Sequence, residues 1–151
     1  MPKIVRIWCA AILLAVAAVG PALAEDPAAH IAQVKTLRGD AFIVRGTDRL
    51  PAKIGDMLYQ SDVVETGPGA TIGFTFVDNS VFSAGPDSQV ALEQFHFDSS
   101  TFKGDMLVDM RKGTLTVVSG DITHATPGAM HIRTPTANLG VRGTTFAVKV
   151  Y

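Results

Sequence analysis

The sequence has 151 residues, 47% of them hydrophobic and 18% charged, which suits one ordinary globular domain. Its 13 basic and 14 acidic residues nearly balance, so the surface is not expected to bind nucleic acid or anionic lipid through its charge. The chain has a single cysteine, so it cannot form a disulfide framework of its own.

Residues 1–24 are predicted to be a cleavable export signal. Lys3 and Arg6 precede an apolar run over residues 7–19, which is shorter than the roughly 20 residues needed to span a bilayer as a helix. Small residues at positions 22 and 24 then supply a signal-peptidase cleavage pattern. Cleavage there removes Cys9 and leaves a mildly acidic mature chain. An uncleaved membrane anchor is the alternative interpretation.

After the signal, residues 25–33 are expected to form a short linker and residues 34–151 a single domain. No second apolar segment approaches the length of a membrane span, so we do not expect the mature chain to be embedded in a membrane. Without a cysteine, the mature domain must draw its stability from its own packed core.

The domain is expected to be all-β. Turn signals built on glycine, proline, aspartate and asparagine recur at short intervals from Ile31 onward, which leaves no room for ordinary helices. Between the turns, apolar and polar residues alternate, as in strands that bury one face. The side chains expected to face the core are Phe42, Val44, Ile72, Phe74, Phe76, Leu115, Val117, Phe146, Val148 and Val150. We therefore expect a two-layer β-sandwich, or a short β-roll or solenoid of many short strands.

Glycine-aspartate pairs recur at Gly39-Asp40, Gly55-Asp56, Gly104-Asp105 and Gly120-Asp121. Turn chemistry explains them, because glycine accepts a positive φ and aspartate bonds nearby backbone. A calcium-binding solenoid is the alternative, but it requires a short fixed period, and the spacing between these pairs is long and uneven.

The histidines and carboxylates are the candidate catalytic and metal-binding groups. His96, His124 and His131 lack the spacing of a metal site on neighbouring strands, so surface or turn positions are expected for them. No serine lies in a Gly-x-Ser-x-Gly elbow. The carboxylate pairs that could be considered are Asp105 with Asp109, Glu93 with Asp98, and Glu65 with Glu93. The aspartates lie at or beside turns, and a glycosidase pair cannot be read from spacing alone. No catalytic residue, cofactor site or metal ligand is predicted.

Residues 134–148, TPTANLGVRGTTFAV, resemble the "TP-x-A … G-V-R-G-T-x-F-x-V" signature of the FecR domain family. Upstream, Gly55-Asp56 and residues 62–70 (DVVETGPGA) are similar to that family's "G-D … D-x-V-x-T-G-x-G-A" block. Further landmarks follow in the family's order at Asp78-Asn79-Ser80, Pro86-Asp87-Ser88 and Gly113-Thr114-Leu115. The resemblance spans about residues 34–150.

The resemblance implies a periplasmic β domain that acts by contact and not by catalysis. The best-known members join a cytoplasmic segment that holds a sigma factor to a periplasmic domain that senses an occupied outer-membrane siderophore receptor. Here only six residues precede the apolar run, so direct contact with a sigma factor is not expected.

The expected function is a protein-interaction or ligand-sensing module in cell-envelope signalling, with an envelope receptor or membrane sensor as partner. One alternative is a structural envelope or adhesion component that binds glycan or peptidoglycan. Another is a metal- or sugar-processing β-barrel enzyme.

The candidate partner-contacting residues are Arg142, Thr144 and Arg133. Gly140 and Gly143 flank the first of these, which predicts a tight bend or a close backbone approach before the last strand. We expect the Arg142 guanidinium to bond carbonyl groups beneath this bend and hold the fold, with partner contact as the alternative. The last strand is expected to expose an edge that a partner strand can join.

Overall fold

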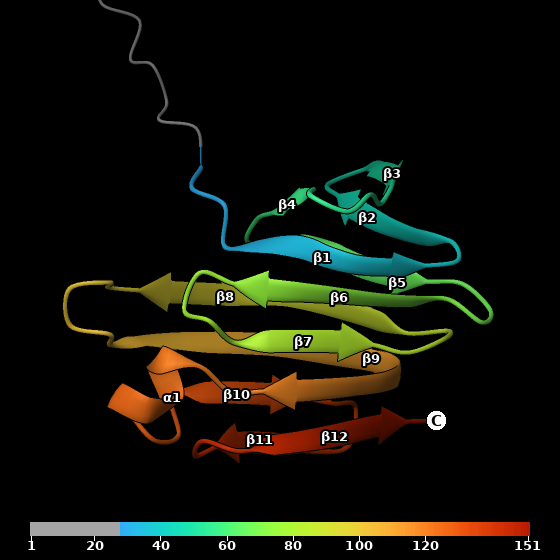
Figure 1. Ribbon diagram of the computed structural model, residues 1–151. Helices are drawn as coiled ribbons and strands as arrows, with labels where there is room; N and C mark the ends of the chain where they lie inside the picture. The colour runs from blue at the N-terminus through green and yellow to red at the C-terminus, as the bar shows by residue number, and fades with distance from the viewer. Residues whose placement is uncertain (1–27) are drawn as a thin grey trace, which may run out of the picture.

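Alternating apolar residues organise residues 28–151, the part of the chain that the computed structural model describes, into twelve strands and one short helix (Figure 1). The predicted export signal lies outside these described residues. In chain order the elements are β1 (Ala32–Arg38), β2 (Ala41–Arg45), β3 (Asp48–Pro51), β4 (Met57–Leu58), β5 (Val63–Thr66), β6 (Thr71–Phe76), β7 (Val81–Ala84), β8 (Gln89–Phe97), β9 (Gly104–Val118), α1 (Asp121–Ala125), β10 (Met130–Arg133), β11 (Asn138–Val141) and β12 (Thr145–Val150).

The strands form one twelve-stranded sheet that folds over on itself at the long strand β9. The first half of β9 pairs with β8 and β10, and its second half pairs with β7 and β12. Two layers therefore face each other, one continuing through β6, β1 and β4 and the other through β5, β2 and β3 (Figure 1). All pairings are antiparallel except β9 with β10, which is parallel. The all-β prediction is confirmed, and the two layers are halves of one strongly curled sheet.

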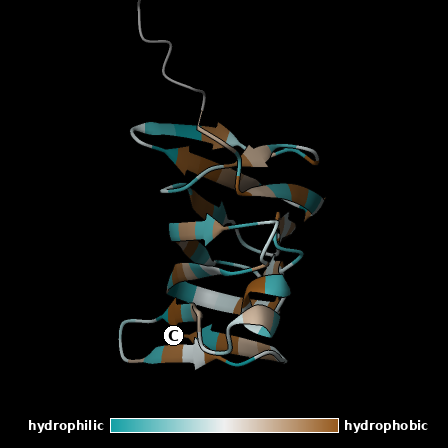
Figure 2. Ribbon diagram, turned by 90° about the vertical axis from the view of Figure 1, so that its left-hand side faces the viewer, coloured by the Kyte–Doolittle hydropathy of each residue, from teal (hydrophilic) through white to brown (hydrophobic). Residues whose placement is uncertain are grey.

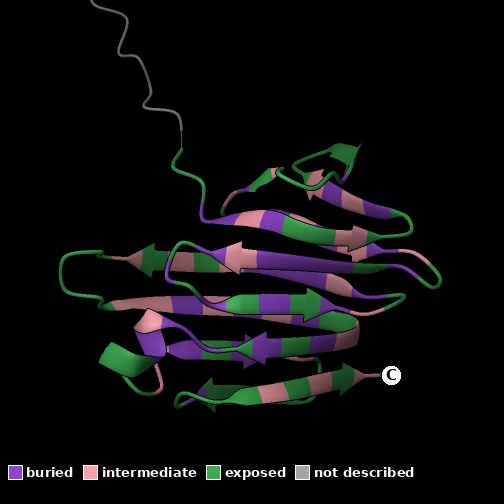
Figure 3. Ribbon diagram, viewed as in Figure 1, coloured by how far each residue is buried: buried purple, intermediate pink, exposed green. Residues whose placement is uncertain are grey.

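Period-two burial builds the core between the layers. Apolar and polar residues alternate along the strands (Figure 2), and buried residues alternate with exposed ones in β7 and β10 (Figure 3). Phe74, Phe76 and Phe82 meet with ring centroids 4.8 to 5.7 Å apart, and Phe95 stacks on Phe76 at 5.3 Å. The prediction for β6 is confirmed, because its three apolar side chains are all buried.

The predicted phase of β2 is wrong. Ala41 and Ile43 face the core, whereas Phe42 and Val44 are only half-buried on the opposite face. The Phe42 ring is covered there by the guanidinium of Arg49 from β3, whose Cζ lies 3.4 Å from the ring centroid. A surface cation over an aromatic face lets the larger residue stay outside while the smaller ones pack inside.

One element and one boundary also differ from expectation. Helix α1 forms where a turn is predicted, because Ile122 and Thr123 are buried against the sheet. Strand β1 begins at Ala32, before the expected start of the domain, and Ile31 already donates its N–H to the carbonyl of Leu58 at 2.8 Å. No helix in residues 28–151 is long and apolar enough to cross a membrane.

Candidate functional site

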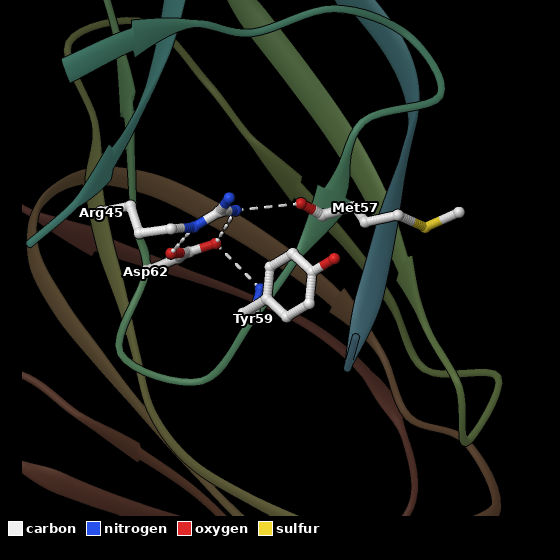
Figure 4. Close-up of polar contacts among 4 residues, drawn as sticks. All are labelled: Arg45, Met57, Tyr59 and Asp62. Atoms are coloured by element: carbon white, nitrogen blue, oxygen red, sulfur yellow. Dashed lines mark hydrogen bonds and ion pairs between the residues drawn. The ribbon is translucent and has the colours of Figure 1, made fainter. Parts of the chain in front are cut away.

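The carboxylate of Asp62 is buried near β4, where an arginine from β2 neutralises it (Figure 4). Arg45 donates from Nε to Oδ1 at 2.9 Å and from Nη2 to Oδ2 at 2.7 Å, and Nη2 also donates to the carbonyl of Met57 at 3.2 Å. The N–H of Tyr59 donates to Oδ2 at 2.8 Å. The hydrogen bond to Asp62 raises the pKa of Arg45 above its ordinary value. This cluster ties β2 to the β4–β5 connection, which is a structural role.

We expect Asp62→Asn to lower the free energy of unfolding by about 2 kcal/mol, because it leaves Arg45 without its counter-charge beside a buried site. The guanidinium is half exposed, so the cost stays below that of a fully buried pair. Glu65→Gln is a matched control, since Glu65 pairs with the more exposed Arg49 at 3.0 Å. Such an ion pair contributes at most about 1 kcal/mol. Equal losses in urea unfolding of the two variants would contradict this assignment.

The polar residues of two further motifs also bond within the fold. Asp78 is fully buried and accepts hydrogen bonds from the N–H and the hydroxyl of Ser80, at 3.1 and 2.8 Å. Ser88 is buried, and its Oγ accepts the N–H of Thr114 at 3.0 Å. These buried side chains hold two turns against β9, so their hydrogen bonds support the sheet.

Arg142 behaves differently from those motif residues, because its side chain is exposed. Within residues 28–151, no hydrogen bond or ion pair joins its guanidinium to another group. The expectation that Arg142 bonds carbonyl groups beneath the bend is therefore wrong. Ser119 holds the bend instead: the Thr144 N–H donates to Ser119 Oγ at 2.8 Å, and the Thr144 carbonyl accepts the N–H of Ser119 at 3.2 Å. Gly143 adopts a φ of +93° within this bend.

The three candidate partner-contacting residues do not form one cluster. Thr144 follows Arg142 in the same bend, with its side chain exposed. Arg133 pairs with Asn138 at the far end of the β10–β11 hairpin, and it donates to Asp109 Oδ2 at 3.1 Å. The structure thus brings together Arg142 and Thr144 and separates Arg133 from them.

Strands β11 and β12 lie at the end of the molecule opposite β3 and β4 (Figure 1). A groove is lined by residues of both strands and of the β10–β11 turn. It consists of two adjoining cavities of about 390 and 180 Å³ that share Leu139 as a lining residue. We call it the basal groove, and its apolar lining is Pro135, Ala137, Leu139, Val141, Phe146, Val148, Val150 and the ring of Tyr151. Leu139 is exposed, and the three side chains from β12 are only half-buried. An apolar surface of this kind suits a binding partner.

Each strand that borders the basal groove has an open edge. Among the described strands, β12 pairs only with β9, and β11 pairs only with β10. The carbonyl of Thr144 points toward β9, because it accepts the N–H of Ser119, the residue that follows β9, at 3.2 Å. Because successive residues of an antiparallel strand bond to opposite sides, Thr145, Ala147 and Lys149 present their backbone N–H and C=O groups at the open edge.

The rim of the basal groove is positively charged. All fourteen acidic residues of the chain precede Ile122, whereas Arg133, Arg142 and Lys149 follow it. In the described part of the chain, Arg133 has a carboxylate partner and the other two have none. Arg142 lines the smaller cavity and Lys149 lines the larger one.

The histidines considered for a metal site lie on separate elements. His96 is on β8, His124 is in α1 and His131 is on β10, and all three are exposed. In the region from residue 28 to the end, no group of three or more histidine, cysteine, aspartate or glutamate side chains is placed to hold a metal ion.

The candidate carboxylate pairs are also dispersed. Glu65 lies opposite Gln89, so Glu93 lies four residues farther along β8, roughly 13 Å at the usual rise per residue. Glycosidase carboxylates lie about 5 to 9.5 Å apart. Asp105 and Asp109 are likewise four residues apart on β9. Asp98 lies in the exposed β8–β9 turn, where hydrogen bonds from Ser100 lower the pKa of its carboxyl group.

Sequence analysis does not identify Leu139, or Pro135 and Ala137 of the β10–β11 turn, as site residues. Their position depends on β11 facing β12, and these strands belong to opposite layers of the sheet. One signal does lie in the sequence, namely the absence of aspartate and glutamate after position 121.

Comparison with known proteins identifies the family of the matched region. Residues 62–151, more than half of the chain, match the family model described as FecR protein. The match begins at the buried Asp62 and runs through the basal groove, while β1 to β4 precede it and complete the same curled sheet. No curated protein and no solved structure matches the chain. The order of motifs, the curled all-β sheet and this match together show that the chain belongs to the FecR protein family.

Proposed function

We propose that the protein is a non-catalytic interaction module of cell-envelope signalling, which acts in the periplasm by binding an envelope receptor or a membrane sensor. The basal groove is the observation that carries this proposal. It combines exposed apolar side chains with two basic residues that lack carboxylate partners in the described chain. Family membership supports a role in signalling or interaction.

The composition of the groove fits a protein partner. Aromatic and arginine side chains contribute most to binding when they are enclosed by a partner, and Phe146 and Arg142 both line the smaller cavity. Arg142 carries five N–H donors that no described residue uses, so it can bond carboxylate or carbonyl groups of a bound protein. This freedom favours partner contact over support of the fold.

Site-specific photocrosslinking in living cells tests the proposal. We expect a photoreactive residue at Leu139 to form an adduct with one envelope receptor or membrane sensor, identified by mass spectrometry. The same residue at Lys35, which is exposed on β1 far from the groove in the sheet order, is the control and should not form that adduct. Adding Arg142→Ala should reduce the Leu139 adduct at least severalfold while the melting temperature stays within about 2 °C of the parent protein.

Other outcomes would replace the proposal. Co-sedimentation with purified peptidoglycan, without any protein adduct, would indicate a structural envelope component. A protein that retains residues 1–24 and stays in the cytoplasmic fraction would contradict a periplasmic role. A large loss of thermal stability in Arg142→Ala would restore the structural interpretation of that residue.

A further inference from the structure

The basal groove and the open edge of β12 together define what kind of segment fits between them. We propose that an extended, acidic segment of the partner protein adds to the open edge of β12 as an extra β-strand and places alternate side chains in the basal groove. This inference rests on the proposed interaction function and deepens it by naming how the partner is held.

The backbone of β12 provides the template for such a strand. Thr145, Ala147 and Lys149 offer N–H and C=O groups along one edge, and β12 contains no proline. An added strand satisfies these groups with ladder hydrogen bonds, as in other cases of strand addition. The interaction therefore does not require a preformed pocket for one particular side chain.

The spacing of the two cavities matches a strand. Phe146 lines the smaller cavity and Val148 the larger one, so the cavities follow each other at a two-residue step along β12. Side chains on one face of an added strand repeat at the same step. Alternate apolar side chains of the partner can therefore enter both cavities and contact Leu139, which the cavities share.

The positive charge of the rim favours acidic side chains on the face of the added strand that points away from the groove. Lysine on a sheet edge discourages indiscriminate strand pairing. Lys149 lies on the open edge and Arg142 lies at the end of the groove, and no acidic residue follows Asp121 in the chain. A carboxylate across from Lys149 is favourable, whereas a second cation is not. The partner segment is therefore expected to alternate apolar and acidic residues.

A second copy of the chain does not fit this requirement. Pairing β12 with its own copy brings together two copies of the segment that follows Asp121. Each copy of this segment carries Arg133, Arg142 and Lys149 and no acidic residue. The first described strand, β1, belongs to the β4 end of the sheet path, away from the groove. The charge on the rim thus favours a different, acidic protein.

Two defined peptides test the inference with the purified full-length protein. One is a labelled eight-residue peptide of alternating valine and glutamate, and the other alternates valine and lysine. We expect the valine-glutamate peptide to bind at least tenfold more tightly in fluorescence anisotropy. The variant Ala147→Pro should weaken its binding at least tenfold, because proline removes an N–H at the open edge and none from the ladder with β9. The matched variant Ala147→Val keeps that N–H and should bind like the parent protein.

A charge-reversal variant keeps the inference testable if Ala147→Pro perturbs the fold. Lys149→Glu should remove the preference for the valine-glutamate peptide, because the new carboxylate offsets the charge of Arg142 at the rim. Unchanged binding by Ala147→Pro, an unchanged preference in Lys149→Glu, or self-association that Ala147→Pro abolishes would each overturn the proposal. Equal binding of parent and Ala147→Pro to phosphatidylglycerol vesicles, without peptide binding, would indicate a lipid surface instead.

Failure of strand addition can be told apart from failure of the interaction function. If the Leu139 photocrosslink to an envelope protein persists in Ala147→Pro, the interaction function stands and strand addition is wrong. If no envelope protein crosslinks to Leu139, the proposed interaction function is wrong, even if the valine-glutamate peptide binds.

Discussion

Replacing Gly113 with alanine is expected to lower the free energy of unfolding by about 4 kcal/mol or more. Gly113 lies where β9 passes from one layer to the other, and it has a φ of +92°. A Cβ at this position would overlap Oγ and Cα of Ser88. Ser88 cannot move aside freely, because its N–H donates to Thr66 Oγ1 at 2.8 Å and its Oγ accepts from Thr114. The substitution therefore combines backbone strain with overpacking in the core.

Gly128→Ala separates those two contributions. Gly128 has a φ of +89°, close to that of Gly113, but no atom lies within 4 Å of a Cβ built there. This control retains only the conformational cost, which is about 1 kcal/mol. Urea unfolding of both variants measures the difference. A loss at Gly113 no greater than that at Gly128 would show that the contact with Ser88 does not hold the bend of β9.

Asp78→Ala is expected to lower the free energy of unfolding by about 3 kcal/mol. Besides its two bonds to Ser80, the carboxylate accepts the N–H of Ile122 at 3.4 Å, and the Asp78 carbonyl accepts the N–H of Asp121 at 2.8 Å. The Ser80 hydroxyl in turn accepts the N–H of Gly120 at 3.0 Å. Removing the carboxylate leaves buried donors without acceptors, and each unsatisfied group costs about 1 to 3 kcal/mol.

Asp98→Ala is the matched control for Asp78→Ala. Asp98 accepts from both the N–H and the hydroxyl of Ser100, in the same aspartate-x-serine arrangement, but its turn is exposed to solvent. Water replaces these bonds when the carboxylate is removed, so thermal and urea unfolding should change only slightly. Comparable destabilisation of the two variants would mean that burial is not what makes the Asp78 turn important.

The residues of the family motifs fall into two groups. Asp62, Asp78, Ser88 and Gly113 hold strands and turns in place, so their substitution should act through stability. The Arg142 guanidinium forms no hydrogen bond or ion pair with a described residue, so its substitution should act through binding. The sequence motif alone does not reveal this division, because an arginine between two glycines can bond carbonyl groups or face solvent equally well.

The strand phase shows where local pattern stops being informative. In β6, apolar residues alternate with threonine and glycine, and the period of two predicts the buried face correctly. In β2, residues 41–44 are all apolar, so alternation cannot say which face is buried. The Arg49 side chain from β3 covers Phe42 on the outer face, and this contact between two strands leaves Ala41 and Ile43 on the buried face.

Helix α1 shows the same dependence on distant residues. Gly120-Asp121 reads like the other glycine-aspartate turns, and the helix is too short to give a helical period. The turn at Asp78, far earlier in the chain, accepts the N–H groups that begin the helix. Only the folded chain brings that turn to the end of β9.

The sequence predicts that the last strand alternates and exposes an edge, and both features hold for β12 in the described chain. The acid-free composition of the segment that follows Asp121 is also a property of sequence alone. Composition and alternation are local, so one chain suffices to determine strand class, family and the sign of the charge on the last segment. The basal groove is not local, because it exists only where β11 and β12 meet from opposite layers after β9 has folded the sheet over. Long-range strand pairing decides where the exposed edge lies, and where Arg142, which has no ion-pair partner among residues 28–151, lies beside it.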